Sequence, residues 1–154
     1  MLPQDKVLML VRIPQEIEKR VLAFEQLLVN IHEILHHHVF TFEVTSYNQH
    51  IYFFVSIERN LKELIEGQIY AQYPFSEIEE VTDYVKPDVL KKGFAGTELE
   101  LLRSDIIPIK TFKEFESDSL SGIFSVMTKA EEDEQIWIQV FVEPLADDWK
   151  LNFL

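Results

Sequence analysis

The sharpest chemical motif in this sequence is a glutamate between two histidines, His32-Glu33-Ile34-Leu35-His36. On a helix, His32 and His36 would share one face and could both bind zinc, while Glu33 would activate a zinc-bound water. A catalytic zinc also needs a third protein ligand. The candidates in the chain are an acidic residue further along or one of three other histidines, His37, His38 and His50. A small zinc-dependent hydrolase is therefore one alternative function.

The position of this motif favours a structural explanation instead. It ends a predicted helix immediately before a predicted strand, whereas a zinc peptidase holds its motif in the middle of a helix. Histidines at a helix C-terminus can cap free carbonyl groups and interact favourably with the helix dipole. We therefore predict no metal site here, and any metal bound by His36-His37-His38 would be adventitious.

Other catalytic patterns are absent from the sequence. It has no cysteine, which excludes thiolate nucleophiles and cysteine-based metal sites. Its four glycines form no phosphate-binding loop, and Ser119 and Ser121 lack the context of a nucleophile. Acidic pairs such as Glu79-Glu80 are typical of a solvated surface in a chain this acidic. We predict a non-enzymatic protein without a cofactor.

The formal charge of −13 limits the class of partner. Nucleic-acid phosphates and anionic membranes repel such a surface, so we expect neither direct nucleic-acid binding nor membrane insertion. Aromatic residues that could stack on bases lack accompanying arginine and lysine. Proteins or small ligands remain as partners. The candidate interface residues are Trp137, Gln139, Phe141 and Trp149.

The first half of the chain has the element order of a ferredoxin-like fold. Period-two or continuous apolar runs predict strands at 7–13, 40–45, 51–57 and 77–81, with a turn at Asn48-Gln49 between the middle pair. Between them, an apolar stripe predicts one long helix, and a second helix is expected to start at Asn60 with Glu63 as a capping box. The stripe of the first helix consists of Ile17, Val21, Phe24, Leu28, Ile31 and Leu35. The order is βαββαβ, and Gly67 in the second helix suggests a close backbone approach.

The second half predicts a related ββαβ unit, giving an α+β fold with a mainly antiparallel sheet and helices on one face. We expect strands at 98–101, 106–112 and 136–142, and a helix capped by Asp118. The predicted division is a ferredoxin-like subdomain at 1–84, a connection at 85–96, a second subdomain at 97–146 and a further segment or docking tail at 147–154. Because the chain ends on apolar residues, we expect the natural polypeptide to continue.

Several segments together resemble the domain that precedes the motor in bacterial type IV secretion and conjugation ATPases of the TraG/HerA-like kind. The segments are Ile13-Pro14, Glu25-Gln26-Leu27, His32, Phe42-Glu43, Gln68-Ile69-Tyr70-Ala71-Gln72-Tyr73-Pro74, Glu77-Ile78, Gly96-Thr97-Glu98-Leu99, Asp105, Pro108-Ile109-Lys110-Thr111, Phe115-Glu116, Asp118-Ser119-Leu120, Glu134, Trp137-Ile138-Gln139, Pro144 and Trp149. This resemblance spans nearly the whole chain, and its motifs are structural rather than catalytic.

The resemblance implies a non-catalytic accessory or assembly domain that acts through protein–protein contacts. The implied partners are a P-loop ATPase motor domain, in the same chain or another, and other secretion-complex proteins, with a homo-oligomer formed through the motor. The implied location is cytoplasmic, including the inner face of the cell membrane as part of a complex. No Walker motif is present, so motor activity does not carry over. A small-ligand-binding ferredoxin-like module is a second alternative to the assembly domain.

Overall fold

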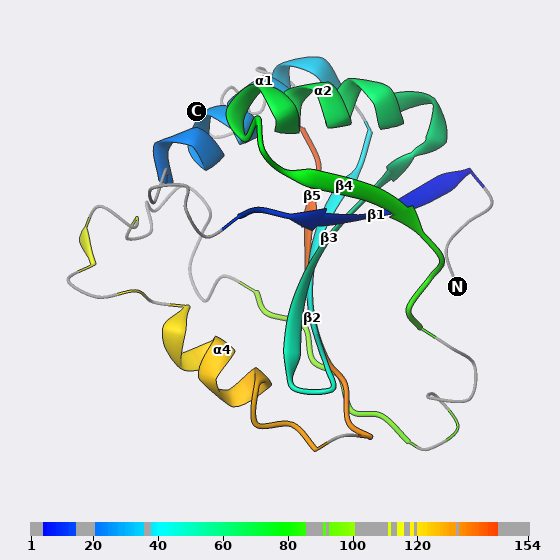
Figure 1. The fold of residues 1–154 in the computed structure, drawn as a ribbon, viewed down its shortest axis with the longest axis vertical. Coiled ribbons are helices and arrows are strands. Elements are labelled where there is room, and N and C mark those ends of the chain that lie inside the picture. The colour runs from blue at the N-terminus through cyan, green and yellow to red at the C-terminus, as the bar shows by residue number, and fades with distance from the viewer. Residues whose placement is uncertain are drawn as a thin grey trace, which may run out of the picture.

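The computed structural model describes residues 5–14, 21–35, 38–85, 91, 93–100, 111, 114–115, 118, 120–131 and 133–144. These residues form an α+β fold in which one five-stranded antiparallel sheet is combined with three α-helices (Figure 1). The elements are β1 (Lys6–Arg12), α1 (Val21–Leu35), β2 (Phe40–Tyr47), β3 (His50–Glu58), the short 3₁₀ helix η1 (Arg59–Leu61), α2 (Lys62–Gln72), β4 (Glu77–Val81), α4 (Ser121–Met127) and β5 (Ile136–Val142).

The strands lie in the order β4-β1-β3-β2-β5, and every neighbouring pair is antiparallel. The predicted hairpin is confirmed: β2 and β3 are joined at Asn48 and Gln49, which both have positive φ, 48° and 63°. Two central residues with positive φ are typical of a type I′ turn, whose twist matches that of the flanking strands. The sheet twists strongly, so β1 and β4 run crosswise to this hairpin in Figure 1.

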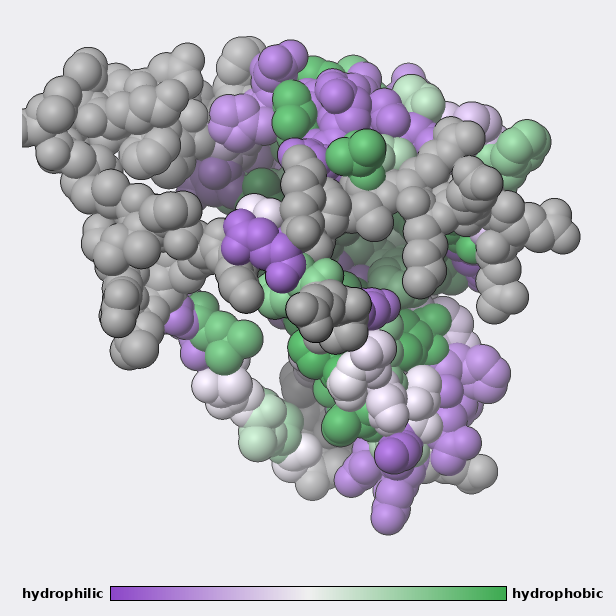
Figure 2. Space-filling view, turned by 90° about the vertical axis from the view of Figure 1, so that its left-hand side faces the viewer, coloured by the Kyte–Doolittle hydropathy of each residue, from purple (hydrophilic) through white to green (hydrophobic). Residues whose placement is uncertain are grey.

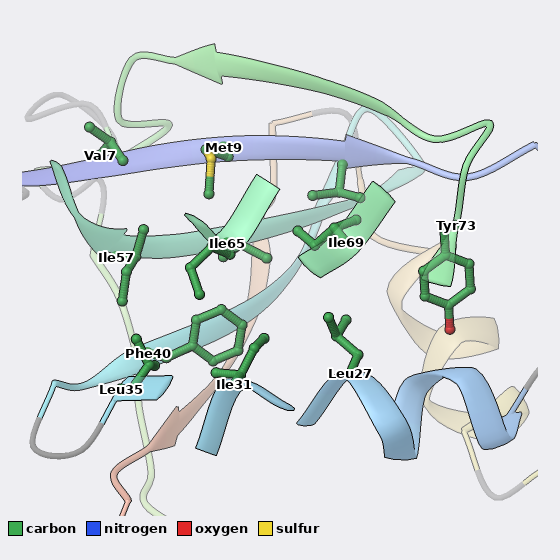
Figure 3. Close-up of a cluster of buried hydrophobic side chains, with 12 residues drawn as sticks. Val7, Met9, Leu27, Ile31, Leu35, Phe40, Ile57, Ile65, Ile69 and Tyr73 are labelled. Carbon is green, nitrogen blue, oxygen red and sulfur yellow. The ribbon is translucent and has the colours of Figure 1, made fainter. Parts of the chain in front are cut away.

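The main core lies between one face of the sheet and the helices α1 and α2 (Figure 3). Alternate residues of β1, Val7, Met9 and Val11, point to this face, as period-two geometry requires. Helix α1 contributes Leu27, Ile31 and Leu35, helix α2 contributes Ile65 and Ile69, and the strands β2 and β3 add Phe40, Val55 and Ile57. We call this side of the sheet the helix face and the opposite side the second face.

The buried side of α1 differs by one position from the predicted stripe. Leu27, Ile31 and Leu35 are buried, whereas Phe24 is exposed and Leu28 is only half-buried. Phe24 instead lies at the margin of the core, where its ring is 5.1 Å from that of Phe42. The predicted beginning of the helix, at 15–20, lies outside the described residues.

The start of α2 corrects two predictions. Asn60 belongs to η1 and Leu61 is the N-cap of α2, which has no side-chain hydrogen bond at that cap, so the predicted capping box is wrong. Among the described residues outside its own helix turn, nothing lies within 4 Å of a Cβ atom added to Gly67, so none of their backbone approaches this glycine closely. The predicted strand at 77–81 is confirmed as β4.

In the second half, β5 and α4 confirm the predicted strand and helix, and both join the first unit. The predicted cap is wrong, because the N-cap of α4 is Leu120, whose backbone N–H donates to Asp118 Oδ1 at 2.9 Å. Strand β5 pairs with β2 along its whole length and extends the sheet on that side. Helix α4 packs on the helix face beside the β2–β3 hairpin. There the hydroxyl of Ser46 donates to the carbonyl of Met127 at 2.5 Å, and the rings of Phe53 and Phe124 meet edge to face at 6.1 Å.

The strand predicted at 98–101 is wrong for residues 98–100, the part of it that the structure describes. Residues 93–100 have no regular secondary structure, and their side chains are exposed, with Leu99 93% exposed. Alternation of Glu and Leu in a short segment does not make a strand when no neighbouring strand pairs with it. The strand predicted at 106–112 lies almost wholly outside the described residues. None of the described helices is long and apolar enough to cross a membrane.

Candidate functional site

The described part of the histidine motif belongs to the last turn of α1. His32 and Glu33 are both exposed, and His36 lies outside the described residues. Two of the proposed third ligands have other partners: His38 Nδ1 is 2.9 Å from Glu58 Oε1, and His50 Nδ1 is 2.7 Å from the carbonyl of Asn48. Within the described part of the chain, no three histidine or acidic side chains are grouped so that they could hold a metal ion.

Three of the four predicted interface residues lie on the second face of the sheet. In the register of β2 and β5, Trp137 is opposite Thr45, Gln139 is opposite Glu43, and Phe141 is opposite Thr41. These alternate residues point away from α1 and α2. The fourth candidate, Trp149, lies outside the described residues.

A buried carboxylate lies on the second face, in the middle of β2. Glu43 is only 6% exposed. Its position in β2 lies between those of Thr41 and Thr45 on a polar side of the strand, which the sequence pattern alone would place in solvent. Its Oε2 atom accepts hydrogen bonds from the hydroxyl of Tyr84 and, at 3.1 Å, from Nε2 of Gln139. Nε2 of Gln139 also lies 3.4 Å from the hydroxyl oxygen of Tyr84. We call these three residues the Glu43 cluster.

Aromatic rings surround the Glu43 cluster. The ring of Tyr84 lies 5.1 Å from that of Phe54 and 5.8 Å from that of Trp137, and Tyr52 extends the row beside Phe54. Burial raises the pKa of the Tyr84 phenol far above its ordinary value, and the hydrogen bond to the Glu43 carboxylate raises it further. The phenol is therefore protonated at neutral pH and acts as a hydrogen-bond donor.

This arrangement connects three separate parts of the chain. Glu43 belongs to β2, Gln139 to β5, and Tyr84 to the segment that follows β4. A phenol with a strongly raised pKa is poorly suited to proton transfer near neutral pH, because general acids and bases work best with pKa values close to the operating pH. The geometry therefore favours a structural role, in which the cluster fixes β5 and the Tyr84 segment to the sheet.

The two outer strands of the described sheet, β4 and β5, differ in charge. Strand β4 is five residues long, and three of them are Glu77, Glu79 and Glu80. Strand β5 has seven residues, none of them charged. Near its end, Val140 on the helix face is 52% exposed and Phe141 on the second face is 67% exposed. Edge charges prevent unwanted strand pairing, and β5 lacks them.

Apolar side chains are also exposed on α4 and the β2–β3 hairpin. Hydrophobic side chains gather in the lower half of the face seen in Figure 2, at the level of α4 and the β2–β3 hairpin in Figure 1. Exposed apolar residues from these elements include Phe53, Ile123 and Val126. Hydrophilic residues cover much of the upper part, at the level of α1 and α2. Contiguous apolar surface of this kind is characteristic of interaction sites.

Sequence reasoning missed Glu43 and Tyr84 as site residues. A glutamate between two threonines in an alternating strand normally faces solvent, and Tyr84 falls in a predicted connection. The available signal was on β5, where Trp137 and Phe141 flank Gln139 on the side away from the apolar isoleucines and valines. A second apolar side on a strand indicates that this side is also covered.

Comparison with known proteins identifies a family without an assigned activity. No curated protein and no solved structure shows a significant match to the chain. A family model described as a domain of unknown function, DUF8128, matches residues 12–153. That span includes α1, α2, α4, β5 and all three residues of the Glu43 cluster. The chain therefore belongs to the DUF8128 family.

Proposed function

We propose that this protein is a non-catalytic accessory or assembly domain of a type IV secretion or conjugation ATPase, and that it acts through protein–protein contacts. Its partner would be the P-loop motor domain of that ATPase, in the same chain or in another. The family resemblance described from the sequence motivates the identity of the partner. The chemistry of the second face and of β5 supports the mode of action.

The arrangement of the first half supports a ferredoxin-like unit as the scaffold. Its element order is βαββαβ, its four strands lie in the order β4-β1-β3-β2, and α1 and α2 pack on the same face. This scaffold serves many unrelated functions, so the activity must be argued from the surface residues. On that scaffold, β5 adds a fifth strand with an uncharged edge.

The observation that carries the proposal is the exposure of Val140 and Phe141 on an uncharged edge strand. These two neighbours point to opposite faces, so the end of β5 presents apolar surface on both sides. Large exposed aromatic residues are enriched at protein interfaces and often dominate the binding free energy. The Glu43 cluster would hold β5 in place for such a contact.

Isothermal titration of this domain with the purified motor domain tests the proposal. We expect binding, and we expect Phe141→Ser to weaken it by about tenfold or more, because an aromatic anchor at an interface contributes more than ~1 kcal/mol. The matched control is Leu22→Ser on the outer side of α1, where Leu22 is 65% exposed. This variant should bind the motor domain like the wild type.

The proposal would be contradicted if the wild-type domain and the motor domain do not associate at high micromolar concentration. Equal losses for the Phe141 and Leu22 variants would also contradict it, because binding would then not depend on β5. An immunoblot of the native polypeptide separates the two forms of the proposal. A product several times larger than 18.2 kDa places the motor in the same chain, and a product of this size places it in another.

A further inference from the structure

The edge of β5 is suited to accept another strand. Within the described residues β5 pairs with β2 alone, so the backbone N–H and C=O groups on its other side have no strand partner there. Its seven residues contain neither proline nor glycine, and at about 3.3 Å per residue they extend over roughly 23 Å. An uncharged edge of this length is a template for strand addition.

The charges around β5 limit what that added strand can be. Residues 130–149 contain seven acidic residues and no lysine, arginine or histidine. Glu134 stands just before β5 and Glu143 just after it, and both are exposed. Among the described residues, neither Glu134 nor Glu143 forms a salt bridge. An incoming strand therefore meets negative charge at both of its ends.

A second copy of this chain is a poor occupant for the same reason. In antiparallel pairing about Gln139, Glu143 of each copy would approach the end that carries Glu134 of the other. Parallel pairing would place identical glutamates side by side. Like charges directly opposite on neighbouring strands are destabilising. Complementarity instead requires lysine or arginine at the ends of the incoming strand.

We propose that β5 binds an extended segment of a partner protein as a sixth strand, with alternating apolar residues in the middle and lysine or arginine at both ends. Its backbone would pair with the edge of β5 that no described strand occupies. Its alternate side chains would pack beside Val140 on the helix face and beside Phe141 on the second face. This inference rests on the proposed function, since it specifies the chemistry of the partner segment.

Synthetic peptides test this inference directly. The probe has seven alternating valine and threonine residues, the length of β5, between pairs of lysines. Two comparison peptides carry the same core between glutamates, or the lysine ends with a proline at the core centre. We expect the first peptide to bind the purified protein and to slow hydrogen exchange of the β5 backbone amides. Both comparison peptides should bind at least about tenfold more weakly, because one repels the acidic flanks and the other cannot pair.

Variants of the protein confirm the location of the peptide. Phe141→Lys should weaken binding of the lysine-flanked peptide by about tenfold or more, because it removes apolar contact and charges the edge. The matched control is Phe75→Lys, since Phe75 is 75% exposed and precedes β4. The control should leave peptide binding unchanged. Equal unfolding midpoints for both variants and the wild type will show that folding is intact.

The results also separate this inference from the proposed function. If no peptide protects β5 while the motor domain still binds in a Phe141-dependent way, strand addition is overturned and the proposed function stands. If the lysine-flanked peptide binds and protects β5 while the motor domain does not bind, strand addition stands and the proposed function is contradicted. If sedimentation shows a dimer that Phe141→Lys dissociates, the occupant is a second copy and the inference is wrong.

Discussion

The carboxylate of Glu43 accepts a hydrogen bond from the hydroxyl of Tyr84, a residue 41 positions further along the chain. The same oxygen accepts a second hydrogen bond from Gln139, which lies 96 positions away. A single buried side chain in β2 therefore joins both the segment after β4 and the last described strand. The second face of the sheet and the uncharged strand β5 are connected through this carboxylate.

Replacing Glu43 should weaken the fold. Glu43→Ala leaves the partly buried hydroxyl of Tyr84 without its acceptor, and a buried polar group left unpaired costs about 1–3 kcal/mol, whereas the exposed amide of Gln139 can bind water instead. We expect the free energy of unfolding to fall by about 1–3 kcal/mol in urea denaturation. Glu43→Gln keeps an acceptor oxygen at this position, so it should cost about 1 kcal/mol. An unchanged stability in Glu43→Ala would show that the cluster does not hold the sheet together.

The ionisation of Tyr84 predicts a pH dependence. Burial and the Glu43 carboxylate raise the pKa of Tyr84, so the folded state keeps this proton when the unfolded chain, with a pKa of about 10, has lost it. The stability contributed by this proton is fully present below about pH 10 and is lost as the pH rises further. Near-ultraviolet absorbance of phenolate should show tyrosines that ionise only on unfolding, and burial raises the pKa of Tyr73 as well as that of Tyr84. Tyr84→Phe should lower the amplitude of this late step by one phenolate, and an unchanged amplitude in the variant would contradict the assignment.

Gly67 and Gly93 should respond in opposite directions to replacement by alanine. Gly67 lies within α2, and an added Cβ would have no neighbour within 4 Å, so Gly67→Ala should stabilise the protein by about 1 kcal/mol. Gly93 has equally open surroundings but a φ of 101°, so Gly93→Ala should be destabilising because the backbone is strained. Thermal unfolding of both variants checks the pair. Similar shifts in the same direction would rule out this explanation.

Zinc should have no effect on folding. His32 and Glu33 are exposed on α1, and the described residues provide no group of three ligands. We expect the purified protein to unfold at the same temperature with and without a strong chelator. We also expect His32→Ala to leave the zinc content unchanged. Stoichiometric zinc that is lost in His32→Ala would revive the hydrolase alternative.

Local patterns in the sequence predicted most of the described elements. Period-two and period-3.6 spacing gave the order of strands and helices as far as β4, and Asn48-Gln49 located the hairpin, because these signals depend on neighbouring residues. The shift from Leu28 to Leu27 on α1 could not be predicted, since it depends on how the helix lies across the sheet. The segment around Leu99 shows that a local pattern can also mislead, because its alternation of Glu and Leu forms no strand in the described residues.

The candidate site was harder to predict because it is assembled from distant segments. Trp137, Gln139 and Phe141 could be identified as interface candidates from β5 itself. The burial of Glu43 depends on Tyr84 and Gln139, and no local signal in β2 indicates these contacts. The pairing of β5 with β2 is likewise set by which strand is left at the edge of the sheet.

Hydrogen exchange of this domain, with and without the purified motor domain, shows whether β5 is the binding edge. We expect slower exchange of the backbone amides in Ile136–Val142 when the motor domain is added, with little change in α2. Phe141→Ser should remove the protection. Complex formation that leaves β5 exchange unchanged, or that protects only the outer side of α1, would contradict the claim that β5 is the binding edge.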